Sequence, residues 1–336
     1  MILITGGAGF IGSNLANYFS SRGEEVVIYD NLSRKGAGRN VEWLKENHPK
    51  IKLIKADTRD YPSLAKAAGN ADAIYHTAAQ VAVTTSVTNP RDDFETNALG
   101  TFNVLEAARN AKTDPVVIFT STNKVYGGMD DVKVLEKKSR YDYENLPHGC
   151  SESQQLDFHS PYGCSKGAAD QYTRDYARIY GLKTVVFRMS CIYGLRQFGT
   201  EDQGWVAFFT LASVFNRPLN IYGDGKQIRD ILFIDDLVNA FDLATKNINK
   251  TKGRIYNMGG GPENTISLLE LLDYLKQISG RGIKTNFSDW RPGDQKVYYS
   301  DIRKAGEELG WEPRVSKKDG IKRLYDWITS HKEYWE

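Results

Sequence analysis

Short runs of consecutive apolar residues alternate, along the first half of the chain, with longer stretches in which apolar residues recur every three or four positions. The short runs predict strands, and because they are apolar on both faces they are typical of a parallel sheet that is covered by helices. The predicted strands are 2–5, 25–29, 51–55, 73–76, 116–120 and 184–188, and the predicted helices are 11–22, 41–46, 63–68, 94–110 and 162–180. This alternation predicts an α/β fold with a doubly wound parallel sheet of the Rossmann type.

The pattern changes after residue 188. Segments 189–229 and about 262–336 are irregular and rich in Gly, Arg and Trp, whereas residues 230–261 again read as strand, helix and strand. We therefore expect a Rossmann domain of residues 1–188 plus about 230–261, and a second, smaller C-terminal α/β lobe of residues 189–229 plus about 262–336. The polar segment 128–160 is long for a connection, which predicts an active-site lid or a contact between subunits.

Composition narrows the class of protein. The 44 Lys and Arg residues nearly balance the 42 Asp and Glu residues, so no charge pattern for nucleic acid or for a membrane surface is visible. The 3 cysteines and 5 histidines are scattered, which argues against a disulfide scaffold and a metal site. No run approaches the roughly 18 apolar residues of a membrane span, and the N-terminus does not resemble a signal peptide. We expect a cytoplasmic protein without nucleic-acid, membrane or metal partners.

A glycine pattern follows the first predicted strand directly. Gly6, Gly9 and Gly12 provide the tight turn and the close backbone approach that a dinucleotide pyrophosphate requires at the start of a helix. Asp30 ends the second predicted strand, where a carboxylate accepts hydrogen bonds from the adenosine ribose and repels a 2′-phosphate. These residues predict an NAD site, although Arg34 and Lys35 leave NADP open as an alternative. Asp57 is expected near the adenine, and the small residues of segment 78–80 near the middle of the cofactor.

A candidate catalytic group lies in the second half of this domain. Tyr162 and Lys166 are four residues apart at the start of a predicted helix, so the phenol and the ammonium share one face. A nearby cation favours the phenolate and is expected to lower the pKa of the tyrosine. Thr122 follows the fifth predicted strand, at the sheet edge where doubly wound proteins bind ligands. The three side chains suit hydride transfer between a secondary alcohol and a nicotinamide.

The glycine pattern, Asp30, Thr122, Tyr162 and Lys166 together resemble the extended short-chain dehydrogenase/reductase superfamily, and the resemblance covers essentially the whole chain. It implies that Tyr162 is the base and acid, that Lys166 binds the nicotinamide ribose and tunes Tyr162, and that Thr122 orients the substrate. The complete set of expected cofactor-binding residues is Gly6, Gly9, Phe10, Ile11, Gly12, Asp30, Asn31, Ser33, Arg34, Asp57, Thr58, Ala78, Ala79, Gln80, Asn97, Tyr162 and Lys166.

The residues after Thr122 restrict the reaction. Dehydratases of this superfamily resemble Thr-Asp-Glu at this place, whereas here Asn123 and Lys124 follow, so elimination lacks its acid/base pair. What remains is a reductase, or an epimerase that returns the hydride to the opposite face of the sugar. The C2 hydrogen of an intact pyranose is not acidic, which favours its removal as hydride.

Segments 30–36, 121–127, 156–172 and 204–206 resemble the CDP-paratose 2-epimerase (CDP-tyvelose 2-epimerase) family. The resemblance implies inversion at C2 of a CDP-linked hexose, tightly bound NAD and a homo-oligomer, either a dimer or a tetramer. Alternatives are a 2-epimerase of CDP-glucose or GDP-glucose, a 4-epimerase or reductase of another nucleotide sugar, and a regulator that senses NAD without catalysis.

The substrate is expected to bind through two arginine-bearing loops. Segments 223–230 and 291–294 resemble the substrate loops of the family, and Arg229 and Arg291 would grip the diphosphate by charge-assisted hydrogen bonds. Related enzymes often carry Asn where this chain has Cys191. The expected substrate-binding residues are Asn123, Cys191, Arg196, Gln203, Gly204, Trp205, Tyr222, Arg229 and Arg291.

Overall fold

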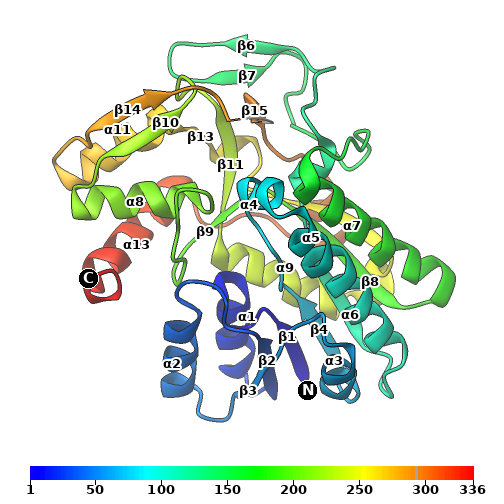
Figure 1. Ribbon diagram of the computed structural model, residues 1–336. Helices are drawn as coiled ribbons and strands as arrows, with labels where there is room; N and C mark the ends of the chain where they lie inside the picture. The colour runs from blue at the N-terminus through cyan, green and yellow to red at the C-terminus, as the bar shows by residue number, and fades with distance from the viewer. Residues whose placement is uncertain (292–293) are drawn as a thin grey trace.

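The computed structural model describes residues 1–291 and 294–336, and its centre is a parallel sheet (Figure 1). Within these residues seven strands pair in the order β12-β8-β5-β4-β1-β2-β3, with every neighbouring pair parallel. The order reverses direction at β1, as in a doubly wound sheet, so the predicted fold class is confirmed. The strands are β1 (Ile2–Thr5), β2 (Val26–Asp30), β3 (Lys52–Lys55), β4 (Ala73–His76), β5 (Val116–Thr122), β8 (Lys183–Met189) and β12 (Arg254–Met258).

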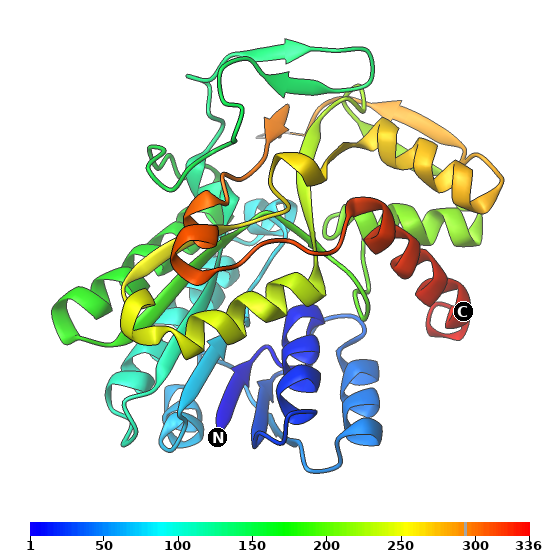
Figure 2. The ribbon, with the colours of Figure 1, turned by 180° about the vertical axis from the view of Figure 1, so that it is seen from behind.

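Helices cover both faces of this sheet (Figures 1 and 2). One layer holds α1 (Phe10–Ser20), α2 (Ala37–Asn47) and α9 (Ile234–Lys246), and the other holds α3 (Tyr61–Ala68), α6 (Gly100–Arg109) and α7 (Ser160–Tyr180). Alternate residues of β1 separate the two cores: Ile2 and Ile4 pack in the cluster that includes α1 and α9, and Leu3 packs in the cluster that includes α3 and α6. This two-sided burial explains why the strands read as continuous apolar runs.

The helix predicted over 94–110 is interrupted in the structure. It consists of α5 (Pro90–Phe94), a π-helical turn η1 (Glu95–Leu99) and α6, and a short helix α4 (Val83–Thr88) precedes it. A π-helical turn has one residue more per hydrogen-bonded ring than an α-helix, and it often marks a functional site. Asn97 lies in this turn and is buried.

The C-terminal lobe has a separate small sheet in which β11 (Ile228–Phe233) pairs with β9 (Cys191–Tyr193), β13 (Thr265–Ser267) and β15 (Val297–Tyr298). The strand predicted to begin at Asp230 was assigned to the Rossmann layer, and this was wrong, because β11 joins the small sheet. The sequence of a strand that is buried on both faces does not reveal which sheet the strand enters. The helix α9 and the strand β12 of that segment return to the large sheet.

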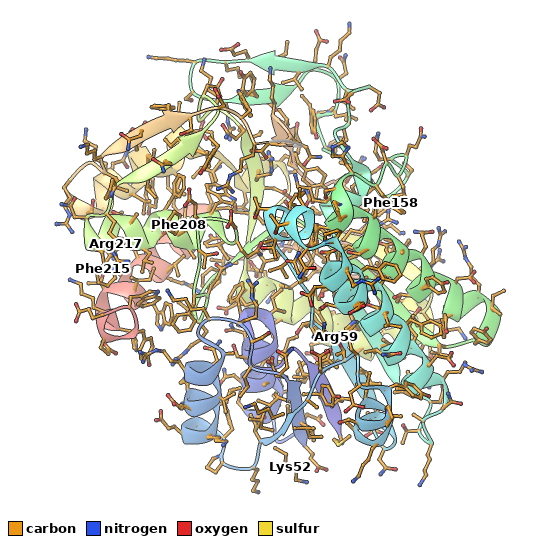
Figure 3. The ribbon with its side chains drawn as sticks, in the orientation of Figure 1. Lys52, Arg59, Phe158, Phe208, Phe215 and Arg217 are labelled. Atoms are coloured by element: carbon orange, nitrogen blue, oxygen red, sulfur yellow. The ribbon has the colours of Figure 1, made fainter. Side chains whose placement is uncertain are left out.

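The remaining elements surround the small sheet or cap the large one. The strand β10 (Leu219–Tyr222) pairs with β14 (Thr285–Ser288), and α8 (Trp205–Phe215) contacts α11 (Leu268–Ser279) and α13 (Lys317–Ser330). Phe208 and Phe215 of α8 are labelled in Figure 3. The other short helices are α10 (Ile248–Thr251), α12 (Arg303–Leu309), η2 (Asn123–Tyr126), η3 (Pro262–Asn264) and η4 (Lys332–Tyr334).

The long segment 128–160 contains a hairpin, β6 (Val134–Glu136) and β7 (Tyr141–Tyr143), at the far edge of the lobe in Figure 2. Tyr143 donates its phenolic hydrogen to the carbonyl oxygen of Val297 (3.0 Å). The backbone N–H of Tyr141 donates to the carbonyl oxygen of Lys226 (2.8 Å). The hairpin therefore belongs to the lobe. Among the described residues, no helix has the length and apolar character needed to cross a bilayer.

Candidate active site

The glycine turn joins β1 to α1 in close contact with the loop after β4. Gly6 has φ +69°, and a side chain there would approach the backbone nitrogen of Ala78 to 2.6 Å. A side chain at Gly12 would collide with the carbonyl oxygen of Gly6. No side chain caps the N-terminus of α1, and no acidic residue lies in its first turn, which holds Phe10 and Ile11. The turn thus presents backbone N–H groups and a helix dipole, a cradle that fits a pyrophosphate.

Asp30 lies beside this turn at the end of β2. Its carboxylate accepts hydrogen bonds from the backbone amides of Ala8 (3.0 Å) and Leu32 (2.7 Å), and burial raises its pKa. Because backbone amides hold it in place, the carboxylate is oriented before any ligand arrives. A fixed carboxylate next to an anion cradle fits the ribose and pyrophosphate of a dinucleotide.

A second carboxylate lies at the end of β3. Asp57 accepts hydrogen bonds from Asn31 (2.8 Å) and Arg59 (2.9 Å), which lower the pKa of Asp57 to about 2. Arg59, labelled in Figure 3, also contacts Asp92 (2.9 Å). The side-chain oxygen of Asn31 accepts a hydrogen bond from the backbone N–H of Ser33, and Ser33 and Arg34 are both exposed. Thr58 is buried, and its carbonyl oxygen accepts a hydrogen bond from Asn103.

The loop after β4 is held by a pair of amides. The backbone N–H of Gln80 donates to Asn97 Oδ1 (2.9 Å), and Asn97 Nδ2 donates back to the carbonyl oxygen of Gln80 (3.0 Å). Ala78 and Ala79 are half-buried in the same loop. Asn97 therefore supports the loop that lies against the glycine turn. Its side-chain N–H groups donate to the carbonyl oxygen of Gln80 and to Asp93, so they are occupied by protein acceptors.

The three candidate catalytic residues come together at the carboxyl end of β5. Thr122 is the last residue of this strand, Tyr162 is in the first turn of α7, and the Thr122 hydroxyl lies close enough to the phenol of Tyr162 to act on its pKa. Lys166, one turn further along α7, is 2% exposed and donates its ammonium hydrogen to the carbonyl oxygen of Thr120 (2.6 Å). The same ammonium lies 4.2 Å from the ring centroid of Phe119. The sequence spacing thus brings a hydroxyl, a phenol and an ammonium to one sheet edge.

The pKa values differ from the sequence expectation. Burial raises the pKa of Tyr162 to about 12, although the Thr122 hydrogen bond acts in the opposite direction, and burial lowers the pKa of Lys166 to about 7. Lys166 was expected to lower the pKa of Tyr162, but its ammonium is engaged with Thr120 and desolvation dominates. A further positive charge beside the phenol, such as an oxidised nicotinamide, would favour the phenolate.

The side facing the lobe carries the expected substrate residues. Cys191 accepts a hydrogen bond from Trp205 Nε1 (3.3 Å), and burial raises the pKa of the Cys191 thiol. Gly204 begins α8 with φ +77°, next to Gln203, whose backbone pairs with Thr200. Asn123 is buried beside Thr122.

Both candidate arginines have acidic partners. Arg229 forms an ion pair with Asp294 (3.0 Å), while Arg291 lies over the ring of Tyr222 (4.0 Å) and within 3.6 Å of Asp202. Tyr222 donates to Glu201 (2.9 Å), which joins the same group. Pro292 and Gly293 of the predicted arginine loop lie outside the described residues.

Arg196 is placed elsewhere. Its guanidinium lies 4.1 Å from the ring centroid of Trp43 and also near Trp327 and Tyr334, and its side chain is buried. The structure thus groups Arg196 with α2 and the C-terminal helix, and it does not bring Arg196 to Arg229 and Cys191.

Sequence reasoning missed two charged residues of the site. Burial and the charge of Arg229 lower the pKa of Lys124 to about 8, with Asp294 acting in the opposite direction, so Lys124 lies near the ion pair of Arg229 and Asp294. Asp93 is fully buried beside Tyr162 and Lys166. Lys124 could have been found from its place two residues after Thr122, whereas no sequence signal marks Asp93.

Comparisons with known proteins agree with this geometry. The chain is 45% identical to a CDP-paratose 2-epimerase of Salmonella typhi, over 98% of this chain and 99% of that protein, which confirms the resemblance seen in the sequence segments. A UDP-glucose 4-epimerase of Thermotoga maritima, solved with UDP-glucose, has a TM-score of 0.85 and 30% identity over 100% of this chain and 99% of that one. A dTDP-glucose 4,6-dehydratase of Streptomyces venezuelae, solved with NAD bound, also has a TM-score of 0.85, with 29% identity over 100% and 98%.

The family model described as GDP-mannose 4,6 dehydratase matches residues 3–324, which is nearly the whole chain. The match includes the glycine turn, the Thr122, Tyr162 and Lys166 group and both arginine loops. The chain therefore belongs to the GDP-mannose 4,6 dehydratase family of the extended short-chain dehydrogenases/reductases.

Proposed function

We propose that this protein is an NAD-dependent epimerase that inverts C2 of a CDP-linked hexose, in a reaction of the CDP-paratose to CDP-tyvelose type. The observation that carries the proposal is the meeting of Thr122, Tyr162 and Lys166 at the carboxyl end of β5, beside a cradle that fits a dinucleotide. The 45% identity to a CDP-paratose 2-epimerase supports the choice of carbon and of nucleotide.

The residues of the site have separate roles. NAD, when bound, supplies a reversible hydride acceptor next to the sugar. Tyr162 removes the proton of the C2 hydroxyl while the hydride leaves C2, and it returns a proton when the 2-ketone is reduced from its other face. Thr122, whose hydroxyl lies close to the phenol of Tyr162, holds the same substrate oxygen in line with that phenol. The Lys166 ammonium opposes the negative charge that develops on the phenol.

The residues after Thr122 exclude a second reaction at this site. A dehydratase must take a proton from one carbon and give one to a leaving hydroxyl, which requires an additional acid/base pair. Asn123 has an amide that does not titrate, and Lys124 carries a positive charge below about pH 8. The site therefore supports hydride removal and return, and it does not support elimination of water.

The diphosphate is expected to bind between the two arginines. Arg229 and Arg291 are paired with Asp294 and with Glu201 and Asp202, so they are held in place without a ligand. An incoming diphosphate carries more charge than a carboxylate and can accept bidentate hydrogen bonds from a guanidinium. Cys191 lies near both Arg229 and Lys124 and is hydrogen-bonded to Trp205, so we expect the sugar to bind beside these two side chains.

The experiment that tests the proposal uses protein purified without added cofactor. Denaturation is expected to release about one pyridine nucleotide per chain, and NMR of the products should show CDP-tyvelose formed from CDP-paratose. CDP-glucose and GDP-glucose serve as competing substrates, and a UDP-hexose tests for 4-epimerisation. Net consumption of the cofactor would indicate a reductase, and turnover of the UDP-hexose alone would refute the proposed reaction.

We also propose that the protein forms a homo-oligomer, a dimer or tetramer, through the face of α5, α6 and α7. Apolar side chains are exposed there, and rings from two helices are in contact, with Phe102 and Tyr172 centroids 6.0 Å apart. Phe94 and Ile179 are 58% and 66% exposed, which is unfavourable in water and is relieved if a second copy covers them. Phe102→Glu should convert the oligomer to monomers in analytical ultracentrifugation, and an unchanged mass would refute this interface.

We place the protein in the cytoplasm. Cys150, Cys164 and Cys191 all lie in the described ranges, and none forms a disulfide. Unpaired cysteines are typical of reducing compartments.

A further inference from the structure

Asp93 lies on α5, and its carboxylate is completely buried. It accepts hydrogen bonds from Ser165 Oγ (2.5 Å), Gln80 Nε2 (2.9 Å) and Asn97 Nδ2 (3.1 Å). These donors are all neutral, and burial raises the pKa of Asp93, although the charge of Lys166 acts in the opposite direction. A buried carboxylate that forms no direct ion pair is costly. Such a group persists where its charge or its geometry is needed.

The three donors belong to three different parts of the active site. Gln80 is in the loop that lies against the glycine turn, and Asn97 is in the π-helical turn η1. Ser165 is on α7 between Tyr162 and Lys166, and its hydroxyl also lies 3.2 Å from the carbonyl oxygen of Tyr162. A single carboxylate thus connects the cofactor loop to the helical turn that carries both catalytic side chains.

The charge of Asp93 reaches both catalytic groups, since it raises the pKa of Tyr162 and that of Lys166. The other charged group that acts on Lys166 is Asp170, which forms a bidentate pair with Arg188 (2.9 Å for both bonds). Asp170 is therefore already neutralised by an arginine, whereas Asp93 is not.

The remaining groups near Tyr162 and Lys166 carry no charge that competes with that of Asp93. His76 is buried between the hydroxyls of Thr5 and Thr101, and burial lowers its pKa to about 3, so it is neutral. Thr122 faces Tyr162 with a neutral hydroxyl. On the same helix as Asp93, Asp92 is half-buried and paired with Arg59.

We propose that Asp93 is a positioning residue for Tyr162 and Lys166: it fixes the first turn of α7 against the cofactor loop and supplies the negative charge that balances the buried ammonium. The proposal rests on the function given above, because it assumes that Tyr162 and Lys166 carry out the proton transfer. Asp93 itself touches neither catalytic side chain through a hydrogen bond and acts through Ser165, Gln80 and its field.

The test compares Asp93→Asn with Asp92→Asn in the holoenzyme. The first substitution keeps the size and one acceptor oxygen but removes the charge, and the second removes a half-buried charge, paired with Arg59, from the adjacent position. The readouts are the amount of bound NAD and the pH profiles of kcat and kcat/KM. The two limbs of such a profile report the apparent pKa values of the coupled pair.

Removal of a negative charge lowers the pKa of every group near it, so both limbs in Asp93→Asn should move to lower pH, by about one unit. The kcat at the optimum should fall about tenfold, with wild-type behaviour in Asp92→Asn. A lower kcat with unmoved limbs would mean a merely structural role and would overturn the proposal.

If Asp93→Asn does not fold, the variant Ser165→Ala still tests the proposal. It removes the shortest hydrogen bond to Asp93 and leaves the charge, so kcat should fall while NAD remains bound; wild-type kcat in this variant would also overturn the proposal. Wild-type protein without epimerase activity would instead refute the proposed function, and the two failures are therefore distinguishable.

Discussion

The ammonium of Lys166 donates to the carbonyl oxygen of Thr120 at a distance of 2.6 Å, two residues before Thr122 on the same strand. This bond ties the catalytic helix α7 to the catalytic strand β5 inside the protein. It also holds a cation in a buried place, where burial lowers the pKa of Lys166 to about 7.

The buried lysine should make stability depend on pH. In the unfolded chain Lys166 stays protonated up to about pH 10, but in the folded chain it loses its proton above about pH 7. The unfolded state then binds more protons, so the free energy of unfolding should rise between about pH 7 and pH 10, by about 1 kcal/mol per pH unit. Urea unfolding at several pH values measures this slope, which should be smaller in Lys166→Met; equal slopes would contradict the assignment.

Replacing Tyr162 by Phe removes the proton acceptor and leaves the ring that packs in the site. The kcat should fall about 10³-fold, which is the usual size of a general acid–base contribution. The content of bound NAD should stay close to that of the wild type, because the glycine turn and Asp30 are intact. Steady-state kinetics and the absorbance of the released nucleotide measure both quantities, and a variant that keeps a tenth of the activity would exclude Tyr162 as the base.

The ion pair of Asp170 and Arg188 should be essential for stability. Both side chains are almost completely buried, and Asp170 also accepts a hydrogen bond from Ser121 (2.7 Å). Asp170→Asn leaves an unbalanced buried guanidinium, which typically costs about 3–5 kcal/mol. The exposed pair of Lys322 and Asp326 provides the control, since Asp326→Asn should cost about 0.5 kcal/mol or less. Chemical denaturation compares the two, and similar losses would be inconsistent with this account.

Lys124 should make nucleotide binding depend on pH. Its pKa is lowered to about 8 by burial and by Arg229, so the side chain loses its charge above about pH 8. Binding of CDP, used as a probe of the diphosphate site, should therefore weaken about tenfold between pH 7 and pH 9.5, equivalent to about 1.4 kcal/mol. In Lys124→Gln the affinity should be low at both pH values. Isothermal titration calorimetry measures this, and an identical pH dependence in the variant would separate Lys124 from the substrate.

The sequence predicted the Rossmann half well because its signals are local. A glycine turn, an acidic residue at a strand end and a tyrosine four residues before a lysine each fall within one loop or one helical turn, and the structure brings Gly6, Asp30 and Tyr162 to the same edge of the sheet. The lobe was harder to predict, because β11 is largely buried on both faces although it contains Arg229 and Asp230, and its partners β9, β13 and β15 come from other parts of the chain.

The rest of the site depends on burial, which a sequence does not display. Arg196 looked like a substrate contact but is enclosed by Trp43 and Trp327, which are far from it in the chain. The pKa of Tyr162 is raised rather than lowered, because packing removes its water. Asp93 stands among polar residues next to Asp92, and only the fold shows that one of the two is buried.

In the proposed reaction, one hydrogen atom leaves C2 of the sugar as hydride and returns to the same carbon. The most direct measurement uses CDP-paratose labelled with deuterium at C2 in ordinary water, with NMR and mass spectrometry of the CDP-tyvelose formed. We expect the product to keep its deuterium at C2 and turnover to be slower than with unlabelled substrate. Product that carries protium from the solvent at C2 would refute the return of the hydride to its original carbon.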